Sequence, residues 1–171
     1  TGPNGSGKST LLGLIAGMFY ADSGMVTTFT SKMGYIGATP LIFEGTLQNN
    51  ILYGNNLDVK KDYILSLLKE LDTFKENIHY DLELLISNRT LSSGQMQKIA
   101  FVRALVSDAE VLLLDEATSN LDQVSKEKVF KRLSENKITI INSTHIPESF
   151  NYDKKYNISI NNEKRSIEEI K

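Results

Sequence analysis

The sequence has no cysteine, no long hydrophobic run and no excess of basic residues. Without cysteine, the chain has no disulfide framework, no thiolate nucleophile and no cysteine metal site. No apolar stretch approaches the roughly 18 residues that a membrane-spanning helix requires. With 19 basic and 21 acidic side chains the net charge is -2, which argues against a dedicated nucleic-acid-binding protein, because such proteins usually carry a basic excess.

The rest of the composition is typical of one globular domain. The 171 residues are 40% hydrophobic and 23% charged, which excludes a disordered tail or a fibrous repeat. A chain of this length buries enough surface on folding to need neither a disulfide nor a structural metal.

Apolar residues alternate between helical and strand spacing along the chain. The helical spacing predicts helices over 8–19, 60–71, 93–106 and 123–133. Apolar runs and alternation predict strands over 26–29, 33–36, 111–114 and 138–141, the last two of them buried. A polar strand pair is expected over 156–160 and 165–167, turning at Asn161 and Asn162. Strands that alternate with helices predict an α/β fold with a mainly parallel sheet, and the mostly helical stretch 45–106 predicts a subdomain on that core.

The clearest motif lies at the start of the chain, where residues 2–9 read Gly-Pro-Asn-Gly-Ser-Gly-Lys-Ser. They match G-x-x-x-x-G-K-[ST] in full, a loop whose glycines let successive backbone N–H groups point at phosphate oxygens. A helix follows at about Lys8, and its positive dipole end also favours an anion. Lys8 is placed to reach the β- and γ-phosphates, and Ser9 to ligate Mg²⁺. The predicted nucleotide-binding residues of this segment are Asn4, Gly5, Ser6, Gly7, Lys8, Ser9 and Thr10.

This motif normally follows a strand, but here it begins almost at the first residue, Thr1. We therefore expect that the chain lacks its N-terminal strands. Two unpaired sheet edges would then make residues 1–171 alone unstable or prone to aggregation.

Polar residues follow two of the predicted buried strands. Asp115 and Glu116 come directly after the strand 111–114, and ligands of parallel sheets bind at the carboxyl ends of the strands. Asp115 is therefore a candidate Mg²⁺ ligand, and Glu116 a candidate general base for the attacking water. His145 follows the strand 138–141 and is a candidate γ-phosphate contact, although a lone histidine is more often structural. His79 has no such context and is interpreted as a surface or loop residue.

Three further segments resemble those of the ABC-type ATPases. Residues 91–95, Leu-Ser-Ser-Gly-Gln, resemble the LSGGQ signature, and 95–105 is similar to the helix that follows it. Residues 119–122, Ser-Asn-Leu-Asp, resemble the D-loop, and His145 falls where the switch histidine of the family would lie. The resemblance implies a RecA-like P-loop NTPase core (1–44 and 107–171) with an inserted α-helical subdomain (45–106), and ATP and Mg²⁺ as cofactors.

The family also implies a partner. ABC ATPase domains pair head to tail, and each ATP lies between the P-loop of one copy and the signature of the other. By resemblance, Ser92, Gly94 and Gln95 would contact the γ-phosphate bound by a partner domain, and Asp122 would bridge the two sites. The resemblance further implies attachment to transmembrane domains at the cytoplasmic face of the cell membrane, with no nucleic acid as a partner.

Residues 35–51 are similar to the Q-loop region of exporter-type domains, and 43–51 in particular resemble the exporter version, which favours an exporter over an importer. Two residues depart from the family pattern. Ala38 stands in place of the Q-loop glutamine, and Ser93 stands in place of the first signature glycine. They suggest slower hydrolysis or a different partner domain. Two alternatives stay open: a soluble ABC ATPase of translation or DNA repair, and a regulatory nucleotide-binding module with little turnover.

Overall fold

The computed structural model describes residues 1–55, 58–74, 80–144, 152–161 and 164–170. In chain order its elements are α1 (Lys8–Ile15), β1 (Met33–Ile36), β2 (Gly45–Thr46), α2 (Leu47–Leu52), α3 (Lys61–Glu70), β3 (Leu85–Ile86), α4 (Ser93–Val106), β4 (Val111–Asp115), α5 (Gln123–Glu135), β5 (Thr139–Ser143), β6 (Lys155–Asn161) and β7 (Lys164–Ile170). None of the helices in these ranges has the length and hydropathy needed to cross a lipid bilayer.

A three-stranded parallel sheet in the order β1-β4-β5 forms the centre of the molecule. In its register, Leu113 of β4 lies between Tyr35 of β1 and Ile141 of β5. Every residue of β4 is buried, as expected of a parallel strand that is covered on both faces. The predicted α/β fold with a mainly parallel sheet is therefore confirmed.

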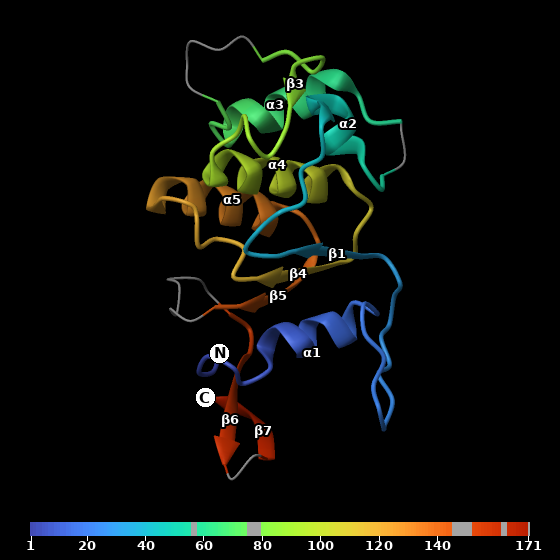
Figure 1. The fold of residues 1–171 in the computed structure, drawn as a ribbon, viewed down its shortest axis with the longest axis vertical. Coiled ribbons are helices and arrows are strands. Elements are labelled where there is room, and N and C mark those ends of the chain that lie inside the picture. The colour runs from blue at the N-terminus through green and yellow to red at the C-terminus, as the bar shows by residue number, and fades with distance from the viewer. Residues whose placement is uncertain (56–57, 75–79, 145–151, 162–163, 171) are drawn as a thin grey trace.

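Helices cover both faces of this sheet (Figure 1). On one face lies α1, where Leu12 forms a small cluster with Leu113. On the other face lie α4 and α5, and a larger hydrophobic core there includes Leu112 and Leu114. Because side chains alternate along a strand, Asp115 belongs to the same face as Leu113, the face that α1 covers.

The helices α2, α3 and α4 lie together on the side of the sheet away from α1 (Figure 1). Their contacts are apolar and fully buried, with Ile51 of α2, Ile64 and Leu67 of α3, and Ile99 of α4 all at 0% exposure. The core that these residues form continues to the sheet and to α5. This arrangement agrees with the helical subdomain proposed for 45–106, whose boundaries stay a prediction.

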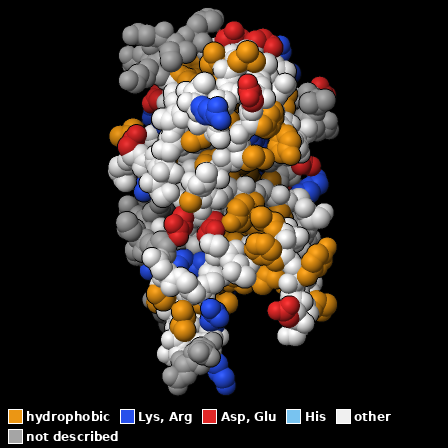
Figure 2. Space-filling model, viewed as in Figure 1, with side chains coloured by type: hydrophobic (Ala, Val, Ile, Leu, Met, Phe, Trp, Pro, Cys, Tyr) orange, Lys and Arg blue, Asp and Glu red, His pale blue; other side chains and the backbone are white. Residues whose placement is uncertain are grey.

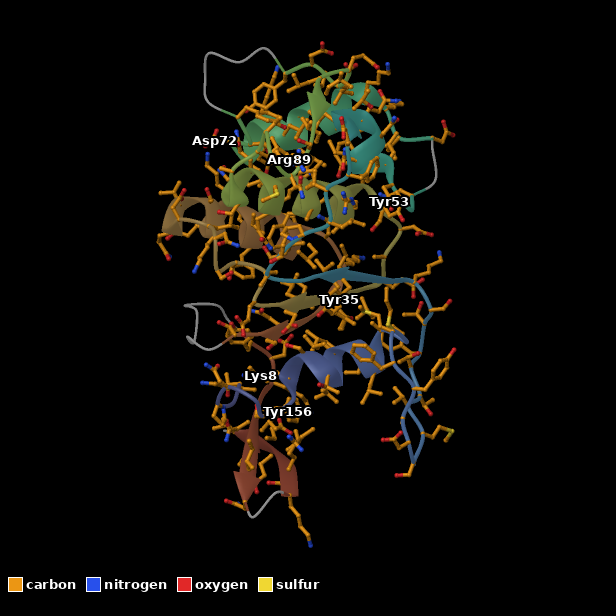
Figure 3. The ribbon with its side chains drawn as sticks, in the orientation of Figure 1. Lys8, Tyr35, Tyr53, Asp72, Arg89 and Tyr156 are labelled. Atoms are coloured by element: carbon orange, nitrogen blue, oxygen red, sulfur yellow. The ribbon has the colours of Figure 1, made fainter. Side chains whose placement is uncertain are left out.

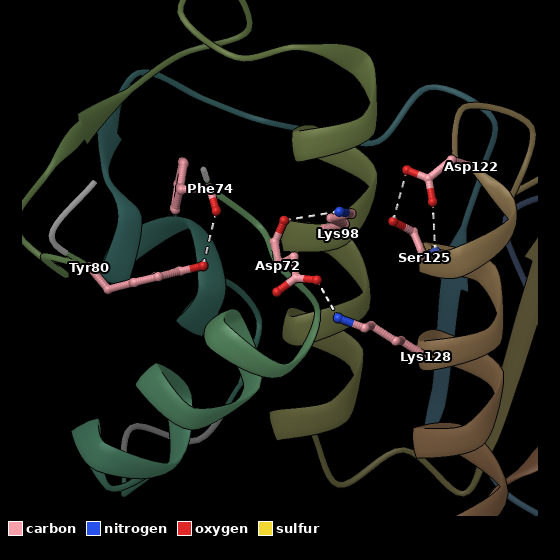
Figure 4. Close-up of polar contacts among 7 residues, drawn as sticks. All are labelled: Asp72, Phe74, Tyr80, Lys98, Asp122, Ser125 and Lys128. Atoms are coloured by element: carbon pink, nitrogen blue, oxygen red, sulfur yellow. Dashed lines mark hydrogen bonds and ion pairs between the residues drawn. The ribbon is translucent and has the colours of Figure 1, made fainter. Parts of the chain in front are cut away.

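Asp72 joins the helices α3, α4 and α5. It follows α3 with a φ of 46°, in the left-handed region that residues other than glycine seldom adopt. Its backbone carbonyl accepts a hydrogen bond from Lys98 of α4 at 2.9 Å, and its carboxylate pairs with Lys128 of α5 (Figure 4). An exposed ion pair adds little to stability by itself, but these contacts tie the end of α3 to both neighbouring helices.

The first helix ends earlier than predicted, at Ile15 rather than Phe19. Gly17 has a φ of 71°, and the N–H groups of Gly17 and Met18 donate to carbonyls in the last turn of the helix at 3.2 and 2.8 Å. This pair of bonds is a Schellman motif, which places a left-handed residue just past the helix. The chain then turns back, and Phe19 packs so closely on Gly13 that a Cβ there would lie 2.3 Å from its ring.

The strand predicted over 26–29 is wrong, because residues 21–32 contain neither helix nor strand. Met25 and Phe29 are 88% and 77% exposed. Thr27 and Thr28 favour extended backbone, but no described strand pairs with this segment to form the hydrogen bonds that a strand requires. Figure 2 shows exposed hydrophobic side chains gathered on one face of the molecule, below the helical layer.

The strands after α5 match the prediction in part. β6 and β7 pair antiparallel, with Ile158 opposite Ile167, which confirms the polar strand pair; Asn162 of the expected turn lies outside the described residues. β5 is less buried than expected, because it is an edge of the described sheet, and Ile141 is 37% exposed. Ile138 was expected within this strand but precedes it.

Candidate functional site

The loop before α1 curls into a cradle. Gly7 caps α1 in the left-handed conformation, with a φ of 97°, and its carbonyl accepts the first helical hydrogen bond from Leu11 at 2.8 Å. Gly2 lies against β6, where a Cβ would come within 2.6 Å of the carbonyl oxygen of Ile158. A side chain at either position would therefore strain or displace the loop.

Lys8 is the cation inside this cradle. It is only 7% exposed, and its Nζ donates hydrogen bonds to the carbonyl oxygens of Gly2 at 2.9 Å and Pro3 at 3.0 Å. Figure 3 shows Lys8 at the start of α1, at the end of the sheet where the strands finish. The ammonium thus lies among backbone oxygens at the start of α1.

The remaining loop residues divide into exposed and buried positions. Ser6 is 1% exposed, and its hydroxyl has no hydrogen-bond partner among the described residues. The other predicted contacts are exposed: Asn4, Gly5, Ser9 and Thr10. The loop therefore presents its polar groups on the outside, where a phosphate would approach the helix N-terminus.

The carboxyl ends of β4 and β5 bring a second set of polar groups together. Asp115 lies opposite Ser143 in the parallel register, and both are buried, at 8% and 6% exposure. Asp115 Oδ1 and Ser143 Oγ have no hydrogen-bond partner among the described residues. Buried polar atoms are nearly always satisfied in native proteins, so two unsatisfied ones at the carboxyl ends of neighbouring strands indicate a site for a polar ligand.

Glu116 follows in a strained conformation. Its φ is 54°, its N–H donates to the carbonyl of Ser143 at 2.9 Å, and its carbonyl accepts from Ser119 at 3.1 Å. A residue other than glycine in this region costs free energy and is found preferentially at functional sites. These main-chain bonds therefore help to fix where Glu116 lies.

Tyr35 was not among the predicted site residues, but the structure places it at Asp115. Its hydroxyl donates to Asp115 Oδ2 at 2.9 Å, from the neighbouring strand β1. Burial, the hydrogen bond and the charge of Asp115, in that order, raise the pKa of Tyr35 to about 12. The Tyr35 hydroxyl therefore keeps its proton and donates a hydrogen bond to Asp115. The period-two alternation that puts Tyr35 and Asp115 on one face was visible in the sequence, but the register between β1 and β4 was not.

The predicted signature segment caps α4. Ser92 Oγ accepts from the N–H of Gln95 at 3.2 Å, and the N–H of Ser92 donates to Gln95 Oε1 at 2.8 Å, which is a capping box. Ser92 and Ser93 are exposed at the tip of the helix. At Gly94, a Cβ would lie 3.2 Å from the carbonyl oxygen of Asn120, so the tip packs against the loop after β4.

The loop after β4 also contacts Ala38, the position where the family has its Q-loop glutamine. Asn120 Nδ2 donates to the carbonyl of Ala38 at 3.0 Å, and Gln97 Nε2, from the buried side of α4, donates to the carbonyl of Gly37 at 3.1 Å. Two side-chain amides therefore hold the backbone at the position where the side chain itself is only a methyl group. Sequence reasoning named neither amide, although a glutamine in the apolar face of a helix is a signal for such a contact.

Asp122 has a local role in the structure. It caps α5, accepting from the N–H of Ser125 at 2.8 Å and from its hydroxyl at 3.2 Å (Figure 4). The backbone N–H of Ser125 is the main cause that lowers the pKa of Asp122. The predicted bridge between two sites needs a second domain and stays a prediction.

The structure thus brings together the predicted loop, Asp115 and Glu116 at one end of the sheet. The signature segment lies at the tip of α4, beside the loop that follows β4. His145 and His79 lie outside the described residues.

Comparisons with known proteins agree with this geometry. The family model described as ABC transporter matches residues 1–119. The lactococcin-A transport/processing ATP-binding protein LcnC of Lactococcus lactis subsp. lactis is 36% identical over 160 residues, which cover 84% of this chain and 22% of that protein. The ATP-dependent permease MDL1 of Candida albicans is 34% identical over 173 residues, which cover 84% of this chain and 24% of that protein.

Among solved structures, a bacterial Atm1-family ABC exporter with ATP bound matches with a TM-score of 0.73 and 25% identity. The match covers 85% of this chain and 28% of that one. The chain therefore spans less than a third of the length of each of these relatives.

Proposed function

Because the chain belongs to the ABC transporter family, as the match over residues 1–119 shows, we propose that it binds and hydrolyses ATP as the nucleotide-binding domain of a membrane exporter. The relatives are ATP-binding transport proteins and a permease, and the matched structure is an exporter with ATP bound. These relatives favour neither a soluble ABC ATPase nor a purely regulatory module.

The observation that carries the proposal is a set of unsatisfied buried polar atoms in the loop before α1 and at the carboxyl ends of β4 and β5, the end of the sheet where Lys8 also lies. Lys8 lies in the cradle, and Ser6, Asp115 and Ser143 each contribute a buried polar atom without a partner among the described residues. A triphosphate with Mg²⁺ supplies both the anion and the cation that this set lacks. Mg²⁺ typically uses one or two protein ligands together with phosphate oxygens and water, which fits Ser9 and Asp115.

Each residue then has a role in hydrolysis. Lys8 and the N–H groups of the loop hold the β- and γ-phosphates, and bound Mg²⁺ neutralises charge on them. Glu116 accepts a proton from the attacking water as general base. Glu116 directly follows β4, so it lies at the carboxyl end of the sheet, where Lys8 also lies.

The second half of the site comes from a partner domain. The exposed tip of α4 with Ser92 and Ser93 forms a helix N-terminus, which suits it to a γ-phosphate bound on another copy or on a related domain. We propose that ATP binding closes two such domains and that hydrolysis separates them. The movement would act on transmembrane domains at the cytoplasmic face of the membrane.

The direct test is phosphate release from Mg·ATP by the protein that contains this chain. We expect release that saturates with ATP and stops when EDTA removes Mg²⁺. Tight ATP binding with no release, even at concentrations where domains pair, would instead support a regulatory module. Absence of ATP binding would contradict the proposal as a whole.

Ala38 provides a sharper test of turnover. Because Ala38 is exposed and the bond from Asn120 goes to its carbonyl, a glutamine side chain fits there without breaking that bond. We expect Ala38→Gln to raise ATP turnover by about two- to tenfold, since it restores one polar contact worth roughly 0.5–1.5 kcal/mol. Ala38→Met, which has similar length but no amide, is the control. Equal turnover and equal transport in Ala38→Gln and the wild type would refute a cost at Ala38.

A further inference from the structure

The contact between Tyr35 and Asp115 joins two strands at the centre of the proposed site. Tyr35 pairs in register with Leu113, and Asp115 lies two residues further along β4, so both side chains leave the same face of the sheet. The phenol reaches along this diagonal and donates to Asp115 Oδ2 at 2.9 Å. Figure 3 shows Tyr35 on β1, on the side of the sheet that faces α1.

The two oxygens of the Asp115 carboxylate are therefore not equivalent. Oδ2 has the phenol as its donor, whereas Oδ1 is buried and has no partner among the described residues. The carboxylate is 8% exposed, and no lysine or arginine of the described residues forms an ion pair with it. A buried charge without a counter-ion is costly, and a single charge-assisted hydrogen bond then has a large influence on its orientation.

We infer that Tyr35 is a positioning residue, which holds Asp115 by one oxygen and leaves the other directed to the divalent cation of the bound nucleotide. The inference rests on the proposed function, because it needs a metal–nucleotide complex at this site. Tyr35 itself does not touch the metal. Its effect is to restrict rotation of the carboxylate, so that Oδ1 is in place before the cation arrives.

Gly37 helps to set this geometry. A Cβ at Gly37 would lie 3.5 Å from the Tyr35 ring, so the chain after β1 passes beside the ring, and Gln97 holds that chain through the Gly37 carbonyl. The ring is thus supported by a segment that α4 fixes. A change in this segment would therefore reach Asp115 through Tyr35.

The experiment measures Mn²⁺ affinity by electron paramagnetic resonance, in the presence of a saturating non-hydrolysable ATP analogue. Tyr35→Phe removes the hydroxyl and keeps the ring. We expect about fivefold weaker Mn²⁺ binding, because one hydrogen bond to a charged group is lost from a partly exposed side chain. Affinity for the same analogue in EDTA should stay unchanged, since that binding does not involve Asp115.

Two further variants make the result specific. Tyr53→Phe, at the C-cap of α2, removes a hydroxyl from a residue that Figure 3 shows away from Lys8, and it should leave Mn²⁺ affinity unchanged. In an Asp115→Asn background, Tyr35→Phe should have no additional effect on the metal, because two residues that act through one contact are not additive.

The outcomes distinguish a failure of the positioning role of Tyr35 from a failure of the proposed function. Unchanged or tighter Mn²⁺ binding in Tyr35→Phe would overturn the inference, as would an equal loss in the Asp115→Asn background. A parallel loss of analogue affinity in EDTA would also overturn it, because that result indicates a structural role for the ring. A wild-type protein that binds neither Mn²⁺ nor the analogue would overturn the proposed function, and the inference with it.

Discussion

Replacing Glu116 by glutamine is expected to lower ATP turnover by about 10³-fold while leaving ATP affinity nearly unchanged. The substitution keeps the size of the side chain and removes its charge and its ability to accept a proton from water. ATP would still bind, because the phosphate contacts come from Lys8 and the loop. The bound ATP would then persist between two domains, so the variant should accumulate as an ATP-dependent dimer.

The conformation of Glu116 makes this substitution informative. The left-handed φ of 54° is held by main-chain bonds to Ser143 and Ser119, and a glutamine keeps both bonds. A loss of turnover would therefore come from the side chain and not from a displaced loop. Phosphate release measures the first effect, and light scattering with and without ATP measures the second.

Glu110→Gln is the matched control. Glu110 immediately precedes β4, at the amino end of the strand that Glu116 follows, and its side chain is 51% exposed in a surface pair with Lys32. The same change in charge there should leave turnover within about twofold of the wild type. If Glu116→Gln retained wild-type turnover, water would have to be activated by another group, and the proposed general base would be wrong.

Elements with a strong local pattern were predicted correctly from the sequence. The run Val111–Leu114 could only be a strand buried on both faces, and β4 has this position. Ser92 was recognised as a helix cap because the hydroxyl and the Gln95 that completes the capping box are neighbours in sequence. In both cases the deciding interactions are local or purely hydrophobic.

The errors occurred where structure depends on partners distant in sequence. Residues 26–29 have strand composition, but a strand exists only when another strand satisfies its backbone, and the described residues provide none. The expected burial of Ile141 also depended on neighbours, since β5 is an edge of the described sheet. The end of α1 is different, because Gly17 is a local stop signal that could have been used.

The same distinction applies to the site. The motif of residues 2–9 and the acidic end of β4 could be proposed as site residues from the sequence because each motif consists of consecutive residues. The bond from Tyr35 to Asp115 and the bond from Asn120 to Ala38 each join residues about 80 positions apart. Their existence depends on strand register and loop packing, which single-sequence patterns do not determine.

Replacing Lys8 by alanine should remove ATP binding itself, in contrast to Glu116→Gln. In the proposed function the Lys8 ammonium bonds the β- and γ-phosphates directly, and hydrogen bonds between charged groups contribute roughly 1.5–3 kcal/mol each. Two such bonds correspond to an affinity loss of at least about 100-fold. Fluorescence titration with a labelled ATP analogue would measure it.

The hydrogen bonds that Lys8 makes to the loop sharpen this prediction. Its Nζ is held by the carbonyls of Gly2 and Pro3, so Lys8→Ala also leaves two oxygens without their donor. A melting curve of the variant therefore has to accompany the titration. Lys131→Ala, at an exposed position of α5, changes the net charge equally and should keep wild-type affinity. A folded Lys8→Ala protein with wild-type affinity would mean that backbone amides alone hold the phosphates, and the lysine would lose its assigned role.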